Sequence, residues 1–274
     1  MTVFSETTIL YNFQTLRTLQ TKMIEVKNVD KSFEGNHVLK NVSALFENGK
    51  TNMIIGASGS GKTVLMKSII GLHRIDNGRI EYDGRNLPDM RMSEIRILRR
   101  EVGMLFQGSA LFDSLSVLEN VMYPLEMFSP STVEEMTDRA RFCLQRVNLE
   151  EKAFALAPSE ISGGMQKRVA IARAIALQPK YLFCDEPNSG LDPKTSLIID
   201  QLIHEITHEF EITTIINSHD MNSVMEIGEN IIFIDKGEKA WEGSKNDIFH
   251  VHNEALNDFV FASELYKQVK KANQ

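Results

Sequence analysis

Gly56-Ala57-Ser58-Gly59-Ser60-Gly61-Lys62-Thr63 is the stretch that decides how the rest of this chain is interpreted, because it matches the G-x-x-x-x-G-K-[ST] pattern of a phosphate-binding loop. Residues 51–55 before it are apolar and β-prone, and residues 64–70 after it carry apolar side chains at helical spacing. Glycines let such a loop point successive backbone N–H groups at one spot, and the helix N-terminus adds partial positive charge there. Strand, loop and helix together predict a site for a chain of phosphates.

Two side chains of this loop have distinct expected roles. Lys62 can reach the β- and γ-phosphates of a nucleotide as a point charge, and the Thr63 hydroxyl can take one place on a Mg²⁺ ion. The alternative is a glycine-rich strand–helix turn with a chance lysine, which we disfavour because both flanks also fit the motif.

The composition is that of a globular protein with one large domain, or one domain with a lobe. The 274 residues are 42% hydrophobic and 24% charged. We find no apolar run of the roughly 18 residues that a spanning helix needs, and no secretory signal pattern. The net charge of −7 argues against a nucleic-acid partner. The cysteines, Cys143 and Cys184, match no metal or redox spacing, which favours a reducing, cytosolic setting.

The distribution of patterns predicts an α/β core interrupted by helices. Residues 23–107 and 179–248 carry short strand-like runs separated by turns. In residues 108–178 helical runs replace them, at 115–128, 132–147 and 164–177. The boundaries of these helices are expected at or near prolines, namely Pro124, Pro130, Pro158 and Pro179.

The two ends of the chain stand apart from this core. Residues 1–22 precede Met23, where strand-like alternation begins, and we interpret them as a dispensable extension; a short amphipathic helix and an upstream start codon are the alternatives. Residues 249–274 form a polar, partly amphipathic tail. Its basic residues, Lys267, Lys270 and Lys271, are interpreted as a solvated run, since three charges add little membrane affinity.

The acidic pair Asp185-Glu186 ends an apolar strand pattern, the place where α/β sheets present residues to ligands. One carboxylate facing the phosphate loop would hold Mg²⁺, directly or through water. Its neighbour would polarise the water that attacks the γ-phosphate. Exposed acidic pairs are common at strand ends, so this hypothesis depends on the phosphate loop upstream.

Ser162-Gly163-Gly164 opens a long helical pattern. A serine cap followed by glycines gives a second group of backbone N–H donors at a helix N-terminus, and so a second anion site. An ordinary capped helix with a permissive turn is the alternative.

Along residues 23–248 these motifs resemble, in the same order, those of the nucleotide-binding subunits of ATP-binding cassette (ABC) transporters. The resemblance implies an α/β fold with a RecA-like P-loop NTPase core, a β-rich N-terminal part and an inserted α-helical subdomain at 108–178. It also implies an ATPase with ATP as substrate and Mg²⁺ as cofactor.

The resemblance assigns ATP contacts to several segments. Phe33 stands where the family has an aromatic residue that stacks on adenine, residues 162–164 resemble the signature motif, and Ser189-Gly190-Leu191-Asp192 resembles the D-loop. The implied ATP-binding residues are Phe33, Gly56, Ala57, Ser58, Gly59, Ser60, Gly61, Lys62, Thr63, Val64, Ser162, Gly163, Gly164 and Asp192.

The resemblance also assigns catalytic and metal-binding roles. Asp185 resembles the Walker B aspartate and Glu186 the catalytic glutamate, while Gln107 resembles the Q-loop glutamine and His219 the switch histidine. Glu186, His219 and Gln107 are therefore the implied catalytic residues. Thr63, Gln107 and Asp185 are the implied metal-binding residues.

The chain departs from the family pattern in places. The signature begins with Ile161 rather than leucine and continues with Met165 where glutamine is commonest. The D-loop has Gly190 where alanine is usual. Because Ser162 and the two glycines after it are intact, we still expect activity.

The resemblance implies partners as well. Two copies would close head to tail around ATP, so that the helix after Gly164 of one copy faces the γ-phosphate held by Lys62 of the other. Closure would reach membrane permease subunits near residues 107–127. Residues 104–125 and the Gly-Gly-Met ending of the signature resemble the Mla (maintenance of lipid asymmetry) ATPases and their organic-solvent-resistance and Mce-associated relatives. That implies a phospholipid transporter at the cytoplasmic face of a bacterial inner membrane, with a periplasmic Mce-type lipid carrier. The tail 249–274 would brace the neighbouring subunit, as extensions of related ATPases do.

Other functions stay open. The chain can serve another ABC transporter, for amino acids or lipoproteins, or it can be a non-transport ABC ATPase, although it has one copy of each motif and no coiled-coil run. His204-Glu205-Ile206-Thr207-His208 spells the H-E-x-x-H zinc-protease signature. We interpret it as the polar stripe of a helix whose apolar side is Leu202, Ile203 and Ile206.

Overall fold

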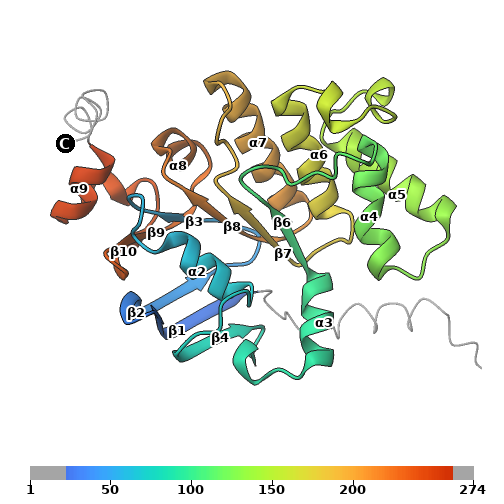
Figure 1. Ribbon diagram of the computed structural model, residues 1–274. Helices are drawn as coiled ribbons and strands as arrows, with labels where there is room; N and C mark the ends of the chain where they lie inside the picture. The colour runs from blue at the N-terminus through green and yellow to red at the C-terminus, as the bar shows by residue number, and fades with distance from the viewer. Residues whose placement is uncertain (1–22, 262–274) are drawn as a thin grey trace, which may run out of the picture.

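The computed structural model of the chain describes residues 23–261 (Figure 1). The predictions for residues 1–22 and for the basic end of the tail at Lys267, Lys270 and Lys271 lie outside the described residues. Within the described part, no helix combines the length and the apolar composition needed to cross a membrane.

The larger of the two described sheets has six strands in the order β10-β9-β3-β8-β7-β6. Neighbouring strands run parallel, apart from β9 and β10, which form an antiparallel hairpin. These strands are β3 (Thr51–Ile55), β6 (Val102–Leu105), β7 (Tyr181–Asp185), β8 (Thr213–Ser218), β9 (Asn230–Asp235) and β10 (Glu238–Gly243). Strands far apart in the sequence thus end at one common edge, where α/β folds bind ligands.

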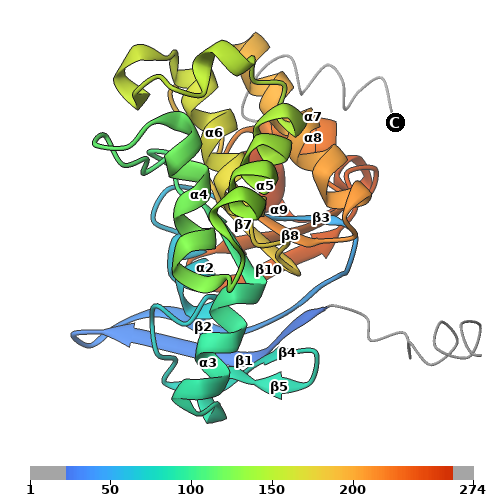
Figure 2. The same ribbon diagram turned by 90° about the vertical axis from the view of Figure 1, so that its right-hand side faces the viewer.

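The smaller sheet is antiparallel and forms the expected β-rich part. Its order is β2-β1-β4-β5. The strands are β1 (Ile24–Phe33), β2 (Asn36–Phe46), β4 (Asn77–Tyr82) and β5 (Arg85–Asn86). Helix α2 (Lys62–Ile69) lies between the two sheets, as Figures 1 and 2 show, and its buried Leu65 and Ile69 belong to one apolar cluster with residues of both.

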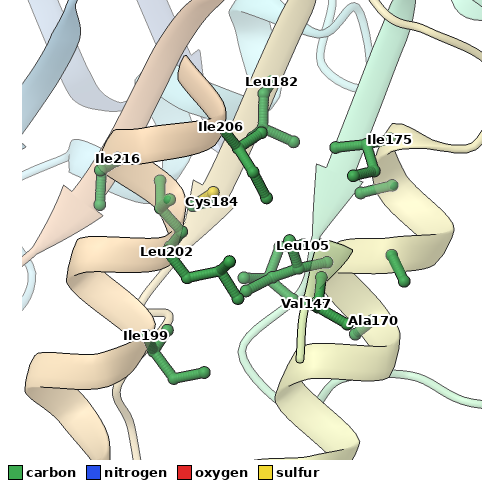
Figure 3. Packing of buried hydrophobic residues seen from close by; sticks show 14 of the residues in the cluster. Leu105, Val147, Ala170, Ile175, Leu182, Cys184, Ile199, Leu202, Ile206 and Ile216 are labelled. Atoms are coloured by element: carbon green, nitrogen blue, oxygen red, sulfur yellow. The ribbon is translucent and has the colours of Figure 1, made fainter. Parts of the chain in front are cut away.

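The period-2 alternation of the strands divides the core into two layers. On β3, Ile54 packs with α2 and the smaller sheet, whereas Met53 and Ile55 pack on the other face, against the remaining helices. Figure 3 shows part of that second layer, where Leu202 and Ile206 meet Leu105 and Cys184. Burial raises the pKa of the Cys143 thiol to about 11, and that of Cys184 further, so both cysteines are packing residues.

The remaining helices of the described residues are α3 (Met92–Glu101), α4 (Val117–Phe128), α5 (Val133–Arg146), α6 (Gly163–Ile175), α7 (Pro193–Glu209), α8 (Met221–Ile227) and α9 (Glu254–Val260). Helices α4, α5 and α6 lie close to the helical runs predicted at 115–128, 132–147 and 164–177. Between residues 23 and 261 there are also four short 3₁₀ turns: Leu87–Asp89, Glu151–Ala153, Pro158–Glu160 and Asp247–His250. Capping boxes start α4 and α5, where the hydroxyls of Ser116 and Thr132 accept from the N–H groups of Glu119 and Glu135.

One boundary prediction is wrong. Pro124 lies inside α4 rather than at its end. A proline there removes the hydrogen bond to the carbonyl of Asn120. Asn120 is fully buried, and its side-chain amide donates to the carbonyls of Phe112, Leu115 and Ser116. The helix continues because tertiary packing and these bonds hold this turn in place.

Candidate nucleotide site

The phosphate loop joins the end of β3 to α2, as the motif predicts. At two of its glycines a side chain would also lie too close to neighbouring strands. At Gly56, with φ of +149°, a Cβ would lie 2.2 Å from the carbonyl oxygen of Ile234. Gly61 caps α2 with φ of +111°, and a Cβ there would lie 3.1 Å from Leu39. The glycines therefore serve both the turn itself and its close approach to β2 and β9.

The hairpin between β9 and β10 braces the loop from outside. The carbonyl of Ser60 accepts from the N–H of Gly237 at 3.0 Å, and the carbonyl of Gly237 accepts from the N–H of Lys40 at 2.8 Å. A chain of backbone bonds thus connects the loop to β2. The loop is held by its own subunit before any ligand arrives.

Lys62 is the cation of the site. It is only 7% exposed, and its Nζ donates to the carbonyls of Gly56 at 2.7 Å and Ala57 at 3.1 Å. Burial lowers the pKa of Lys62, while the charges of Glu186 and Asp185 act in the opposite direction. The side chain curls over the loop, with the acidic pair near enough to act on its charge.

The polar atoms of the loop fit a phosphate chain. The Oγ of Ser60 is buried and has no hydrogen-bond partner, which is costly unless a ligand provides one. Ala57, Ser58 and Gly59 are exposed at the rim, as is Thr63 at the start of α2. Phosphate oxygens would accept from these hydroxyls, from the helix N-terminus and from Lys62.

Asp185 and Asn217 occupy neighbouring positions at the ends of β7 and β8, where they are register partners. Asn217 Nδ2 donates to Asp185 Oδ1 at 3.0 Å. Asn217 is a site residue that was not predicted, although a polar residue near the end of an apolar strand pattern was a usable signal. The Asp185 carboxylate and the Thr63 hydroxyl would offer the oxygen ligands that Mg²⁺ prefers, and their role as metal ligands stays a prediction.

Glu186 turns away from the strand immediately after Asp185. It has φ of +46°, which is uncommon for a residue with a side chain and typical of strained functional positions. Its N–H donates to the carbonyl of Asn217 at 3.0 Å, and its carboxylate lies 2.9 Å from Nδ1 of His219. The Glu186 side chain is 18% exposed and that of His219 is 62% exposed. The structure thus brings together the residues predicted as base and switch.

Gln107 connects the predicted D-loop with helix α6. Its Nε2 donates to Ser189 Oγ at 3.1 Å, which leaves its side-chain oxygen available to a metal ion. Its backbone carbonyl accepts from Nζ of Lys167, a lysine of α6 that is only 4% exposed and also contacts the carbonyl of Phe106 at 3.4 Å. Sequence reasoning missed Lys167, because a lysine within a helical pattern is normally solvated.

The signature loop opens α6, which packs on the sheet face opposite to α2. Ser162 caps the helix by accepting from the N–H of Met165 at 3.3 Å. Ser162 and Gly163 are exposed, and Gly164 is half-buried. A Cβ on Gly164 would lie 2.7 Å from Thr195 of α7, so this glycine is needed for helix packing.

The D-loop prediction for Asp192 stays a prediction, but the structure shows another use of this carboxylate. Asp192 caps α7 by accepting from the N–H groups of Lys194 and Thr195, each at 3.1 Å. Gly190 has φ of +80°, which an alanine adopts only with strain. The glycine at 190 thus suits the conformation of this loop.

Phe33 ends β1 and is 39% exposed. Its ring meets the ring of His73 edge to face with centroids 5.2 Å apart, and Nζ of Lys31 lies 5.0 Å from its centroid. Such a half-exposed ring is available for stacking on a base, and adenine stacking stays a prediction.

The chain is similar to known proteins over most of its described length. Residues 39–189 match the family model described as ABC transporter. The methionine import ATP-binding protein MetN of Clostridium tetani is 38% identical over 89% of this chain and 76% of its own length. The glutamine transport ATP-binding protein GlnQ of Escherichia coli is 40% identical over 81% of this chain and 91% of its own length.

Two solved structures share the fold. A dimeric ATP-binding cassette, MJ0796, in a post-hydrolysis state bound to ADP and Pi has a TM-score of 0.73 at 35% identity, and the match covers 81% of this chain and 98% of that one. The cbiO1 protein of Clostridium perfringens, part of an ABC transporter complex, has a TM-score of 0.79 at 26% identity, over 91% and 99% of the two chains. The predicted fold class, a P-loop core with antiparallel and helical parts, is confirmed.

Proposed function

The chain belongs to the ABC transporter family as an ATP-binding subunit and ATPase that uses Mg²⁺, and we propose that it powers the import of an amino acid or a comparably small polar solute. The support is its similarity to proteins named for methionine import and glutamine transport. Amino-acid transport was one of the alternatives that the sequence left open.

The predicted phospholipid cargo is corrected, and it becomes the second candidate. The relatives give no support to lipid cargo or to a Mce-type carrier. One observation keeps it as the second candidate, namely that residues 104–125 resemble the Mla ATPases. This segment exposes Phe106, Phe112 and Tyr123, and the last two rings pack together with centroids 4.6 Å apart.

In the proposal, this exposed apolar surface beside Gln107 and on α4 docks the permease. It continues along α4 to Met127 and Phe128, which are also exposed. Exposed apolar patches of this kind mark interaction sites. The chain would then sit as a peripheral subunit on the cytoplasmic face of a bacterial inner membrane.

The phosphate loop would bind the triphosphate. Lys62 would exchange its bonds to the loop carbonyls for the β- and γ-phosphates, and the backbone N–H groups at Gly61 would surround the same oxygens. Thr63, Asp185 and the side-chain oxygen of Gln107 would hold Mg²⁺, which neutralises charge on the phosphates when bound.

Glu186 would act as the general base for the attacking water. The observation that carries this assignment is its 2.9 Å contact with His219 at the strand edge, beside the acidic partner Asp185 and close enough to Lys62 to act on its charge. A carboxylate held by a histidine is positioned to accept the proton of a water. The expected result for Glu186→Gln, retained binding with lost hydrolysis, tests this role.

A second copy of the chain would complete the site. The exposed Ser162 and Gly163 present the N-terminus of α6 to solvent, so this donor group is free to meet the γ-phosphate held by a partner. The similar cassette MJ0796 is dimeric in its solved structure. In the proposal, ATP joins the two copies and hydrolysis releases them.

Transport assays on a purified complex test the cargo. The tagged full chain would be purified from its native membranes, the copurified integral membrane protein identified, and the complex placed in vesicles. We expect an amino acid, added together with a protein that binds it and delivers it to the permease, to raise the rate of ATP hydrolysis by the complex. Stimulation by phospholipid transfer alone would favour the second candidate, and a chain that copurifies with no membrane protein would favour a non-transport ATPase.

A further inference from the structure

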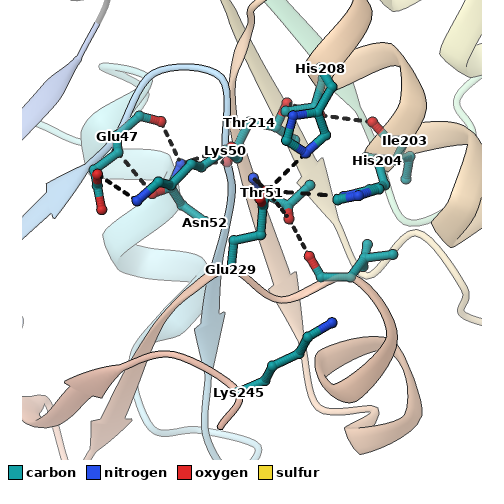
Figure 4. A network of polar contacts seen from close by, with 12 residues as sticks. Glu47, Lys50, Thr51, Asn52, Ile203, His204, His208, Thr214, Glu229 and Lys245 are labelled. Atoms are coloured by element: carbon teal, nitrogen blue, oxygen red, sulfur yellow. Dashed lines mark hydrogen bonds and ion pairs between the residues drawn. The ribbon is translucent and has the colours of Figure 1, made fainter. Parts of the chain in front are cut away.

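Two histidines and a glutamate meet at a place that the nucleotide site does not use. His204 and His208 lie one turn apart on α7, and Glu229 lies in the connection between α8 and β9 (Figure 4). Thr51, which contacts Glu229, begins β3, whereas the phosphate loop follows the last residue of β3. The cluster therefore lies at the opposite end of the strand from Lys62.

The ligand atoms of these residues are close to one another. His208 Nε2 lies 3.2 Å from Glu229 Oε2, and His204 Nδ1 lies 4.0 Å from the same oxygen. One nitrogen or oxygen of each residue lies within 4.8 Å of the others, and among residues 23–261 no other group of three such side chains meets this criterion. Ligands on a tetrahedral Zn²⁺ are about 3.3 Å apart, as bonds of about 2.0 Å require. Small side-chain rotations would bring the three atoms to these distances.

We propose that His204, His208 and Glu229 bind one divalent transition-metal ion of the zinc type, with water in the fourth position. Two imidazoles and one carboxylate are an established ligand set for Zn²⁺ and suit Mg²⁺ and Ca²⁺ poorly, since those ions prefer oxygen ligands.

The glutamate is already held in position for this role. Its Oε2 accepts from the backbone N–H of Thr51 at 2.8 Å. The Thr51 hydroxyl, which also donates to the carbonyl of Ile227, lies 3.0 Å from the same oxygen. Such outer hydrogen bonds orient a metal-binding carboxylate and raise affinity. Since they come from the first residue of β3, the carboxylate is fixed to the central sheet.

A buried histidine nitrogen without a partner is the second observation. Nδ1 of His204 is inaccessible to solvent and forms no hydrogen bond, because its 4.0 Å separation from Glu229 is too long. A buried ring nitrogen left in this way destabilises the fold. A metal ion between His204 and Glu229 would satisfy that nitrogen, and the two histidine rings already pack edge to face with centroids 4.4 Å apart.

The arrangement differs from that of a zinc protease. In the H-E-x-x-H signature the glutamate between the histidines is the base. Here Glu205 pairs with Arg146 of α5 at 3.2 Å, and the third ligand comes from outside the signature. We therefore assign no catalysis to this site. Bound metal would join α7 to the start of β3 and to the loop after α8, and so stabilise the fold by mass action.

A competing positive charge on this side of the molecule is that of Lys245. Its Nζ donates to the carbonyl of Glu226 at 2.9 Å, and Figure 4 shows the side chain below Glu229. A nearby ammonium opposes a cation that is held by charge alone. Neutral imidazole nitrogens, which bond zinc directly, depend less on the surrounding charge.

The test is a calorimetric titration of the full-length chain with Zn²⁺, in excess Mg²⁺ and without nucleotide, so that Mg²⁺ occupies the oxygen ligands near Lys62. We expect one Zn²⁺ per chain. Removal of a ligand, in His204→Gln or in His208→Gln, should weaken binding by about 100-fold or more, since even outer-shell changes cost 10–100-fold. Glu205→Gln, on the same helix turn, is the matched control and should bind like the parent chain.

Two further measurements keep the test decisive. Co²⁺ in place of Zn²⁺ should give the visible absorption of a tetrahedral site in the parent chain and in Glu205→Gln, and lose it in both histidine variants. Circular dichroism would verify that the variants fold, which we expect because the two side chains are 38% and 44% exposed. Parent-like Zn²⁺ affinity in the double variant His204→Gln/His208→Gln, or no stoichiometric binding by the parent, would overturn the proposal.

Discussion

The phosphate loop and the signature loop both start a helix with glycines. Only the phosphate loop is surrounded by groups of its own subunit that suit a phosphate. Around the phosphate loop the chain supplies the buried Lys62, an unpartnered Ser60 hydroxyl and backbone bonds from Gly237. Around the signature loop Ser162 and Gly163 are open to solvent, and α6 lies on the other face of the sheet from α2. Two similar local motifs thus have different surroundings.

This difference indicates how the two loops can bind phosphate. A helix N-terminus alone attracts an anion weakly in water, typically by 0.3–1 kcal/mol at an exposed position. A buried cation beside it adds a charge-assisted bond in a less polar environment. We therefore expect the phosphate loop to bind nucleotide in a single subunit, and the signature loop to contribute only within a dimer.

Glu186→Gln should have the largest effect, because it removes the proposed base and leaves both loops intact. We expect hydrolysis to fall by about 10²–10⁴-fold, the range of general acid–base contributions, with ATP binding retained. Because ATP would not be consumed, the variant should accumulate as a nucleotide-bound dimer in size-exclusion chromatography. The measurement is phosphate release at saturating ATP.

The control for Glu186 is Glu238→Gln, a change at an exposed position of β10. It should hydrolyse ATP at the parent rate. Parent-like turnover in Glu186→Gln would remove this carboxylate from the chemistry and leave Asp185 as the remaining acidic candidate.

Lys62→Ala removes the cation that distinguishes the phosphate loop from the signature loop. We expect hydrolysis to fall by about 10²–10³-fold, as when one donor to developing charge is removed, and nucleotide binding to weaken in the isolated subunit. Fluorescent-nucleotide titration measures the binding. Lys67→Ala in the last turn of α2 is the matched control; equal losses in both variants would mean that helix stability, not phosphate contact, is affected.

Ser162→Arg tests whether the signature loop acts on a partner. We expect ATP binding by the single subunit to stay unchanged and hydrolysis to fall, since the arginine blocks approach of the second copy. In mixed dimers with Glu186→Gln chains, a head-to-tail arrangement predicts that hydrolysis depends on which copy carries which change. Ser159→Arg, at an exposed position just before the loop, is the control. Equal hydrolysis at both sites of dimers carrying Ser162→Arg would exclude the arrangement.

The sequence allows the local parts of this structure to be predicted because they depend on neighbours along the chain. Short-range spacing indicates the strand, loop and helix around Lys62. Short-range capping signals indicate where α4 and α5 begin. The order of the strands does not, since β3 pairs with β8 and β9, which are more than a hundred residues away.

Tertiary packing also explains the residues that were missed. Pro124 continues a helix that its local rule would end, because the buried Asn120 and its neighbours hold that turn. Lys167 looks like an ordinary solvated lysine until α6 packs beside Gln107. The H-E-x-x-H segment lies on α7, as the helical interpretation expects, and its link to Glu229 depends on a fold that spacing does not reveal.

The smallest expected effect concerns the loop between the two sites, at residues 188–192. Asn188 Nδ2 donates to Asp200 at 2.8 Å and to Ser223 Oγ at 3.0 Å, and Leu191 lies next to Gly163. Asp200 is 3% exposed, and burial raises its pKa from 3.8 to about 6. The folded chain therefore binds this proton more tightly than the unfolded chain does.

The sign of the pH dependence follows from that difference. Between pH 4 and pH 6 Asp200 is more protonated in the folded state than in the unfolded state. The contribution of Asp200 to the free energy of unfolding therefore falls as pH rises, by up to about 3 kcal/mol at 1.36 kcal/mol per pKa unit. Asp200→Asn should remove this fall, and urea unfolding at pH 4 and pH 7 measures it, with Asp138→Asn on exposed α5 as control. If Asp200→Asn keeps the parent's pH dependence, another group carries it. If Asp200→Asn also keeps full ATPase activity, the charge of Asp200 is not needed to hold residues 188–192 beside the signature loop. The difference in phosphate binding between the phosphate loop and the signature loop then depends on Lys62 and Ser162 alone.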